Sequence, residues 1–214
     1  MTNGPSWTRQ RAAELRDHWW WRPGWKVGTR FYTWHLTFGD APELHGLVAA
    51  YQDALRGMAG LDPVPREWLH LTMQGVGHVE DVPGETVEGI VEGARERLAE
   101  LPAVRVEFQR PVIGAEAVVL PALPPDAVAQ IRTTIRAAMA ERIAVPEKAE
   151  GFQPHVTVAY SSSEQPAAEV AAALSAVSVA AVDCAISSAS LIELHRDRRM
   201  YEWRTIAELP IGRA

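Results

Sequence analysis

The 214-residue sequence contains a single cysteine, Cys184. One thiol cannot close a disulfide within the chain and cannot supply the cysteine pairs of a zinc site. Such sparing use of cysteine is typical of a reducing compartment, so we expect a cytoplasmic protein. The sequence also has no His-Glu-x-x-His pattern and no aspartate cluster at ligand spacing, so we expect neither a metal nor a cofactor.

Long apolar runs and an excess of positive charge are also missing. There is no run of about 18 apolar residues that could span a membrane, and the charged N-terminal stretch lacks the apolar core of a secretion signal. The formal net charge is −6. General binding to a nucleic-acid backbone depends on many lysines and arginines, so this charge argues against a nucleic-acid coat protein. A ligand with one or two phosphates remains compatible.

What is present is an ordinary globular composition, 47% hydrophobic and 22% charged. Apolar stripes at helical spacing alternate with short strand-like runs, which predicts a mixed α+β (α/β) fold in one core or in two small lobes packed together. The expected helices are 41–60, 83–101, 124–142 and 167–178. The expected strands are 29–38, 68–76, 104–110, 115–123, 155–160, 182–197 (with a break) and 200–209.

The first 27 residues form a separate, tryptophan-rich segment with Trp19, Trp20, Trp21 and Trp25. We expect a short helix whose indoles pack against the main body, because tryptophan buries a large area. A lid or a partner-docking segment is the alternative. Residues 28–214 are then expected to form a single domain of two intertwined lobes, and the protein to be a monomer.

A histidine followed two residues later by a threonine occurs three times, at His35, His70 and His155. Side chains at i and i+2 of a strand point to the same face. An imidazole and a hydroxyl on one face are either a satisfied buried pair or a working pair. The three threonines are Thr37, Thr72 and Thr157.

The order of elements singles out two of these motifs. Strand, helix, loop and His-x-Thr strand run from 29 to 76, and the same order recurs from 115 to 160. In the second copy Val119 stands at the point that matches His35. If the copies are structural repeats, His70 and His155 face each other across a pseudo-twofold axis, and His35 is a structural residue.

Two histidines suit acid–base chemistry at phosphorus. One neutral imidazole can take a proton from water while a protonated one gives a proton to the leaving oxygen. Threonine hydroxyls beside them can donate to non-bridging phosphate oxygens. We therefore expect His70, Thr72, His155 and Thr157 to be the catalytic residues, without deciding which histidine is the acid.

The segments HLTM at 70–73 and HVTV at 155–158 resemble the signature of the two-histidine (2H) phosphoesterase superfamily. This includes the RNA 2′,3′-cyclic phosphodiesterase and 2′-5′ RNA ligase group, and the resemblance in order covers about residues 28 to 209. It implies a bilobal fold of two βαβ-type repeats, with antiparallel sheets around a V-shaped cleft. It also implies metal-independent cleavage of cyclic phosphodiesters or 2′-5′ linkages. The expected ligand is a nucleotide or a short RNA with a terminal cyclic phosphate.

The resemblance is incomplete after the second motif. RNA-processing members often have an arginine there, whereas this chain has Ala159 and Tyr160. Tyr160 is a candidate substrate-binding residue that could stack on a base, or simply a ring that covers the core. In the stretch HRDRR, Arg196, Arg198 or Arg199 could reach a phosphate, although a polar hairpin is the simpler expectation. A binding module without turnover and an enzyme for cyclic oligonucleotides are the alternative functions.

Overall fold

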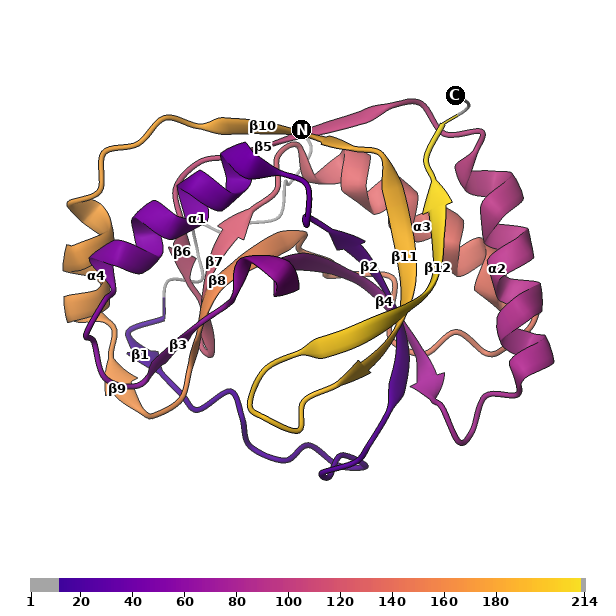
Figure 1. Cartoon of the computed structure of the whole chain (residues 1–214), viewed down its shortest axis with the longest axis horizontal. Helices are drawn as coiled ribbons and strands as arrows, with labels where there is room; N and C mark the ends of the chain where they lie inside the picture. Colours follow the sequence, from indigo (N-terminus) through magenta and orange to yellow (C-terminus); the bar gives the residue numbers. More distant parts are fainter. Residues whose placement is uncertain (1–11, 213–214) are drawn as a thin grey trace.

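The computed structural model describes residues 12–212 and shows a mixed α+β fold with antiparallel sheets (Figure 1). Two four-stranded sheets form its frame, with strand orders β12-β11-β2-β4 and β3-β8-β7-β6. The first sheet consists of β2 (Phe31–Thr37), β4 (His70–His78), β11 (Ser188–His195) and β12 (Glu202–Pro210). The second consists of β3 (Leu61–Pro63), β6 (Val112–Ile113), β7 (Ala117–Pro121) and β8 (His155–Ser161).

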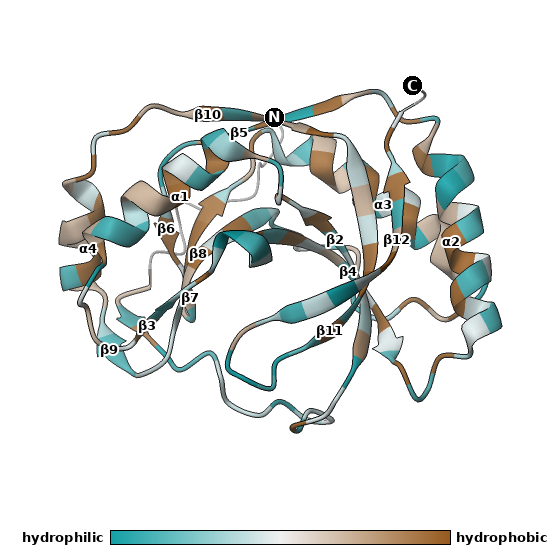
Figure 2. Ribbon diagram, viewed as in Figure 1, coloured by the Kyte–Doolittle hydropathy of each residue, from teal (hydrophilic) through white to brown (hydrophobic). Residues whose placement is uncertain are grey.

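All four predicted helices are present and cover the two sheets from outside (Figure 1). They are α1 (Pro42–Ala54), α2 (Gly84–Leu98), α3 (Pro125–Ala140) and α4 (Ala168–Ser175). Each buries one apolar face against the body, as the brown stripes of Figure 2 show. The first helix is shorter than expected because the chain turns at Gly57 and Gly60, both with positive φ.

The two copies predicted from the element order have the same strand register. In the first, His35 lies opposite Thr72 across β2 and β4. In the second, Val119 lies opposite Thr157 across β7 and β8. The helices are exchanged between the copies, because α1 packs on β8 while α3 packs on β4. Each of these two helices therefore packs on a strand of the other predicted copy.

The long strand predicted at 182–197 is interrupted, as expected. Its first part, β10 (Val182–Ile186), pairs with β5 (Val104–Phe108) in a separate two-stranded sheet. Its second part is β11, which lies in the centre of the first sheet beside β2. This switch places the β11–β12 hairpin next to the His-x-Thr strands.

Residues 12–28 form a segment that we call the N-terminal strap. The prediction of a helix is wrong for this segment. Residues 1–11 of the predicted segment lie outside the residues that the structure describes. The strap is extended, with β1 (Glu14–Leu15) paired to β9 (Gln165–Pro166). Pro23 and the positive φ of Gly24 turn the chain between Trp21 and Trp25. Only some indoles pack as expected: Trp19 is buried, but Trp20 and Trp21 are about half exposed.

Within residues 12–212, no helix has the length and apolar character that crossing a membrane would require.

Candidate active site

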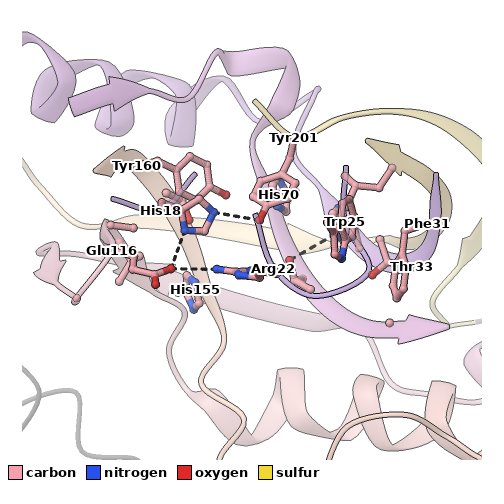
Figure 3. A pocket seen from close by; sticks show the side chains of 18 of the residues that line it. His18, Arg22, Trp25, Phe31, Thr33, His70, Glu116, His155, Tyr160 and Tyr201 are labelled. Carbon is pink, nitrogen blue, oxygen red and sulfur yellow. Dashed lines mark hydrogen bonds and ion pairs between the residues drawn. The ribbon is translucent and has the colours of Figure 1, made fainter. Parts of the chain in front are cut away.

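A cavity of about 480 Å³ opens between the two sheets and the N-terminal strap. Four groups of side chains line it (Figure 3). The strap contributes His18, Arg22 and Trp25, and the first sheet contributes Phe31, Thr33, His35, His70, Thr72, Gly75 and Leu194. The second sheet, with its β6–β7 connection, contributes Gly114, Glu116, Ala117, Val119, His155, Thr157 and Tyr160. Other loops contribute Glu147 and Tyr201. All four predicted catalytic residues therefore meet in one cavity.

The two motif histidines are held in the same way. His70 is the first residue of β4, and its Nδ1 lies 2.8 Å from the carbonyl oxygen of Trp68. His155 is the first residue of β8, and its Nδ1 lies 2.7 Å from the carbonyl oxygen of Gln153. A carbonyl can only accept, so Nδ1 carries the proton and donates it. Nε2 is then the basic nitrogen of each neutral ring, as a pair of acid–base residues requires.

Burial keeps both rings neutral. Desolvation, with a smaller contribution from His155, lowers the pKa of His70 to about 4 despite the opposing hydrogen bond to the Trp68 carbonyl. Desolvation also lowers the pKa of His155. Because burial penalises the charged form, the cavity holds two uncharged bases at neutral pH. A bound anion would reverse this preference for the imidazole nearest to it.

The two motif threonines differ in their surroundings. Thr72 is exposed, and its Oγ1 lies 3.4 Å from Nε2 of His35. Thr157 is buried and hydrogen-bonded to the Tyr160 hydroxyl. Both line the cavity, so each hydroxyl is within the space that a ligand would occupy.

His35 is a buried residue of β2, but it is also part of the site. It is 1% exposed, and its ring stacks on His70 with centroids 4.2 Å apart and planes 3° from parallel. Trp203 closes the edge of both rings, at 5.5 Å from His35 and 5.3 Å from His70. Burial and the neighbouring His70 hold the pKa of His35 well below its usual value. The His70 ring is therefore fixed by aromatic contacts as well as by its carbonyl.

Tyr160 lines the cavity but has little free surface. It is 5% exposed, and the ring of His18 stacks on it with centroids 4.3 Å apart. Desolvation raises the pKa of its hydroxyl. In this arrangement His18 occupies a face of the Tyr160 ring, so that face is not open to a base.

The arginines of the β11–β12 hairpin do not line the cavity in the described structure. Arg196 is 3% exposed and donates to the carbonyl oxygen of Trp20 at 2.8 Å. Arg198 pairs with Glu202, and Arg199 lies beside the Ser162 carbonyl and Asp17. The expected polar hairpin is therefore confirmed, and the alternative, an arginine of this hairpin at the ligand, is not seen in the lining of this cavity.

The lining residues missed from the sequence include His18, Arg22, Trp25 and Glu116. Glu116 falls in the predicted strand 115–123 and the other three in the tryptophan-rich segment, and they meet only through tertiary contacts. The one sequence signal was the dense aromatic and charged run that includes Trp25. Among residues 12–212, no three His, Cys, Asp or Glu side chains gather as metal ligands would.

Comparison with known protein families also points to the two His-x-Thr motifs at His70 and His155. A sequence model of the 2'-5' RNA ligase superfamily matches residues 44–198, which contain both motifs. The chain belongs to this superfamily. The predicted membership in the 2H phosphoesterases is thus confirmed. The match does not include the N-terminal strap or His35.

Solved structures share the fold of this superfamily member at low sequence identity. TT0787 of Thermus thermophilus is 17% identical, with a TM-score of 0.64 over 85% of this chain and 97% of that one. Escherichia coli LigT complexed with NADP+ is 16% identical, with a TM-score of 0.62 over 86% and 98%. LigT was also solved with 3'-AMP, at 16% identity and a TM-score of 0.63 over 86% and 99%. The comparison with curated proteins found no match.

Proposed function

We propose that the protein is a metal-independent phosphodiesterase that acts on 2′,3′-cyclic phosphates or 2′-5′-linked nucleotide or RNA ends. The observation that carries the proposal is the matched placement of His70 and His155. Both begin a strand, both use Nδ1 on a carbonyl of their own segment, and both line one cavity with a threonine two residues on. In this proposal the two copies are the lobes of a bilobal, pseudo-twofold molecule, and the cavity is its V-shaped cleft.

The reaction needs one proton accepted and one donated. Nε2 of one neutral histidine takes a proton from water as the water oxygen bonds to phosphorus. The P–O bond to the 2′ or 3′ oxygen breaks, and the other histidine, protonated, gives its Nε2 proton to that oxygen. The products are a phosphate monoester and a free hydroxyl. Exchange of protons with solvent restores the starting pair.

The substrate itself supports the protonated partner. Burial lowers the pKa values of both histidines, and the charge of a bound phosphodiester favours protonation of the adjacent imidazole. Thr72 and Thr157 donate to the non-bridging oxygens as negative charge builds there. That E. coli LigT was solved with 3'-AMP supports a nucleotide as the ligand.

Hydrolysis of the four nucleoside 2′,3′-cyclic monophosphates in EDTA tests the proposal. We expect turnover by the wild type and a loss of at least about a hundredfold in kcat for both His70→Ala and His155→Ala, with unchanged circular dichroism. The position of the product phosphate would show which oxygen leaves. A rate abolished by EDTA and restored by a divalent metal would contradict the mechanism. Nucleotide binding without turnover would favour a binding module, whereas cleavage of cyclic oligonucleotides alone would favour the other alternative.

A further inference from the structure

The cavity has little positive charge with which to bind an anionic ligand. A phosphodiester carries a negative charge, but burial keeps the motif histidines neutral, and Glu116 and Glu147 also line the cavity. Among the described lining residues, Arg22 is the one with a permanent positive charge. It comes from the strap, outside the part of the chain that the superfamily match covers.

Arg22 is held at the cavity by a carboxylate. Its Nη2 lies 3.0 Å from Oε2 of Glu116, and its side chain is 38% exposed. A guanidinium has five N–H donors, and this ion pair uses one of them. Figure 3 shows Arg22 extending toward Glu116 within the cavity. The guanidinium can therefore keep its anchor and still donate to a phosphate oxygen.

The anchor is itself fixed by a hydrogen-bond chain. Nδ1 of His18 donates to Oε2 of Glu116 at 3.0 Å, and the Tyr201 hydroxyl donates to Nε2 of His18 at 3.0 Å. Burial and the nearby charge of Arg22 lower the pKa of His18 to about 4, so this histidine is neutral and both its nitrogens are satisfied. The indole of Trp20 also donates to Glu116, at 3.3 Å. Arg22 is thus attached to a rigid group.

The strap is clamped to the body on both sides of Arg22. Before it, the His18 amide donates to the carbonyl oxygen of Ser161 at 2.8 Å. After it, the Gly28 amide donates to Asp197 at 2.9 Å. Arg196 lies against the rings of Trp19 and Trp21, at 5.5 and 5.3 Å. This wall of the cavity therefore has a defined position without a ligand.

The same strap adds an aromatic surface. Trp25 is partly exposed, lines the cavity and lies 5.5 Å from the ring of Phe31 with a 35° tilt. Nucleic-acid bases stack on such rings with little dependence on sequence. The strap thus presents a cation, Arg22, and a partly exposed indole, Trp25, to the same cavity, and these suit the phosphate and the base of a nucleotide.

We propose that the N-terminal strap is the substrate-recognition wall of this site, with Arg22 binding a phosphate oxygen and Trp25 stacking on the base of a nucleoside phosphate. The inference rests on the proposed function for the identity of the ligand class. It assigns recognition to a segment that carries neither motif.

Equilibrium binding separates this inference from the question of turnover. Calorimetry with 3′-AMP, adenosine and inorganic phosphate compares wild type with Arg22→Gln, Arg22→Lys and Trp25→Ala. We expect Arg22→Gln to weaken 3′-AMP binding at least tenfold and to leave adenosine binding unchanged, and Arg22→Lys to recover part of the loss. Trp25→Ala is expected to weaken binding of adenosine and 3′-AMP but not of phosphate. Arg56→Gln, which removes an exposed arginine just after α1, is the charge-matched control and should bind as wild type does.

Glu116→Gln distinguishes ligand binding from a merely structural role. If Arg22 only secures the strap, Glu116→Gln and Arg22→Gln should weaken 3′-AMP binding alike. If Arg22 binds phosphate, removal of the competing carboxylate should retain or tighten binding. Unchanged 3′-AMP affinity in Arg22→Gln would overturn the inference, even if the wild type hydrolyses cyclic nucleotides. Arginine-dependent binding without turnover would support it while contradicting the proposed function.

Discussion

His70 and His155 have the same backbone attachment but different neighbours. His70 stacks on His35, whereas the matching place in the other copy holds Val119. Nδ1 of His35 is buried and has no hydrogen-bond partner in the described structure. A buried unpaired N–H is costly, so the proton belongs on Nε2, where it donates to Oγ1 of Thr72. The hydroxyl hydrogen of Thr72 is then left to donate to a ligand.

His35→Phe tests this positioning role. Phenylalanine keeps a ring under His70 but cannot donate to Thr72, so we expect kcat to fall about tenfold, the size of one net hydrogen bond. The free energy of unfolding should not fall, because replacing the imidazole also removes Nδ1, a buried nitrogen without a hydrogen-bond partner. Urea denaturation and steady-state kinetics measure the two effects.

Thr72→Ala is the matched control for His35→Phe. If the two residues act together, the double variant should be no slower than Thr72→Ala alone. Additive losses, or a wild-type kcat in His35→Phe, would contradict the proposed positioning.

The pH dependence of the rate follows from the lowered pKa values of His70 and His155. The active free enzyme needs one neutral and one protonated histidine, and this form is scarce above both pKa values. The plot of kcat/KM against pH should therefore be bell-shaped, with its maximum below about pH 6.5. Bound phosphodiester raises the pKa of the neighbouring imidazole, so the kcat optimum should lie at higher pH than that of kcat/KM. Profiles from about pH 4 to 9 check this; a kcat/KM maximum above about pH 7.5 would count against it.

At the scale of elements, the loop before β8 is held by one buried arginine of α3. Nε of Arg132 donates to the carbonyl oxygen of Met73 at 2.8 Å. Its terminal nitrogens donate to the carbonyl oxygens of Ala149 at 2.8 Å and Lys148 at 3.0 Å. This one side chain therefore ties the loop that leads into His155 to the strand that starts at His70.

Arg132→Leu should damage both stability and catalysis. Loss of the three hydrogen bonds should lower the free energy of unfolding by about 2–4 kcal/mol, because the buried Met73 carbonyl oxygen loses its Arg132 donor and the loop loses its attachment. We also expect faster hydrogen exchange in residues 144–154 and a kcat/KM at least tenfold lower. Thr133→Ala, an exposed change on the same helix, is the control and should alter none of these. Unchanged exchange in the loop would show that Arg132 does not hold it.

The regular elements were predictable, and the strap was not. Apolar stripes such as Val87, Ile90, Ala94 and Leu98 predicted helices because packing requires that spacing. The His-x-Thr pairs predicted shared strand faces for an equally local reason. His18, Arg22 and Glu116 meet only after distant segments pack, and no local pattern in the sequence indicates which side chains come together. The tryptophan run suggested a helix, but contacts with the β11–β12 hairpin and the turn at Pro23 and Gly24 override local preference.

Across the whole molecule, buried neutral histidines make stability depend on pH. Folding lowers the pKa of His18 and of His70 from 6.5 to about 4, and those of His35 and His155 also fall. The unfolded chain therefore binds more protons between pH 6.5 and 4. Stability is full above about pH 6.5 and declines as the pH falls through this window.

Urea denaturation at about pH 7.5 and about pH 5 measures this decline. At about 1.4 kcal/mol per pKa unit, each of His18 and His70 accounts for about 3 kcal/mol over the full window. His70→Gln has no such group at position 70, so its free energy of unfolding should fall less than that of wild type between the two pH values. Equal decreases in both proteins would show that His70 is not buried in its neutral form.

The contacts of the strap have a consequence for biosynthesis. Arg22 is among the earliest of the described residues to leave the ribosome, whereas Tyr201 and Arg196, which fix its anchor and its neighbours, are among the last. The second sheet, the four helices and the β2–β4 pair all precede this hairpin in the chain, so they emerge while the strap still lacks these partners. A chain released from the ribosome before the β11–β12 hairpin is synthesised would therefore carry both histidine motifs, but its N-terminal strap would not be fixed against the cavity. Ligand capture would begin only once translation has reached the far end of the hairpin.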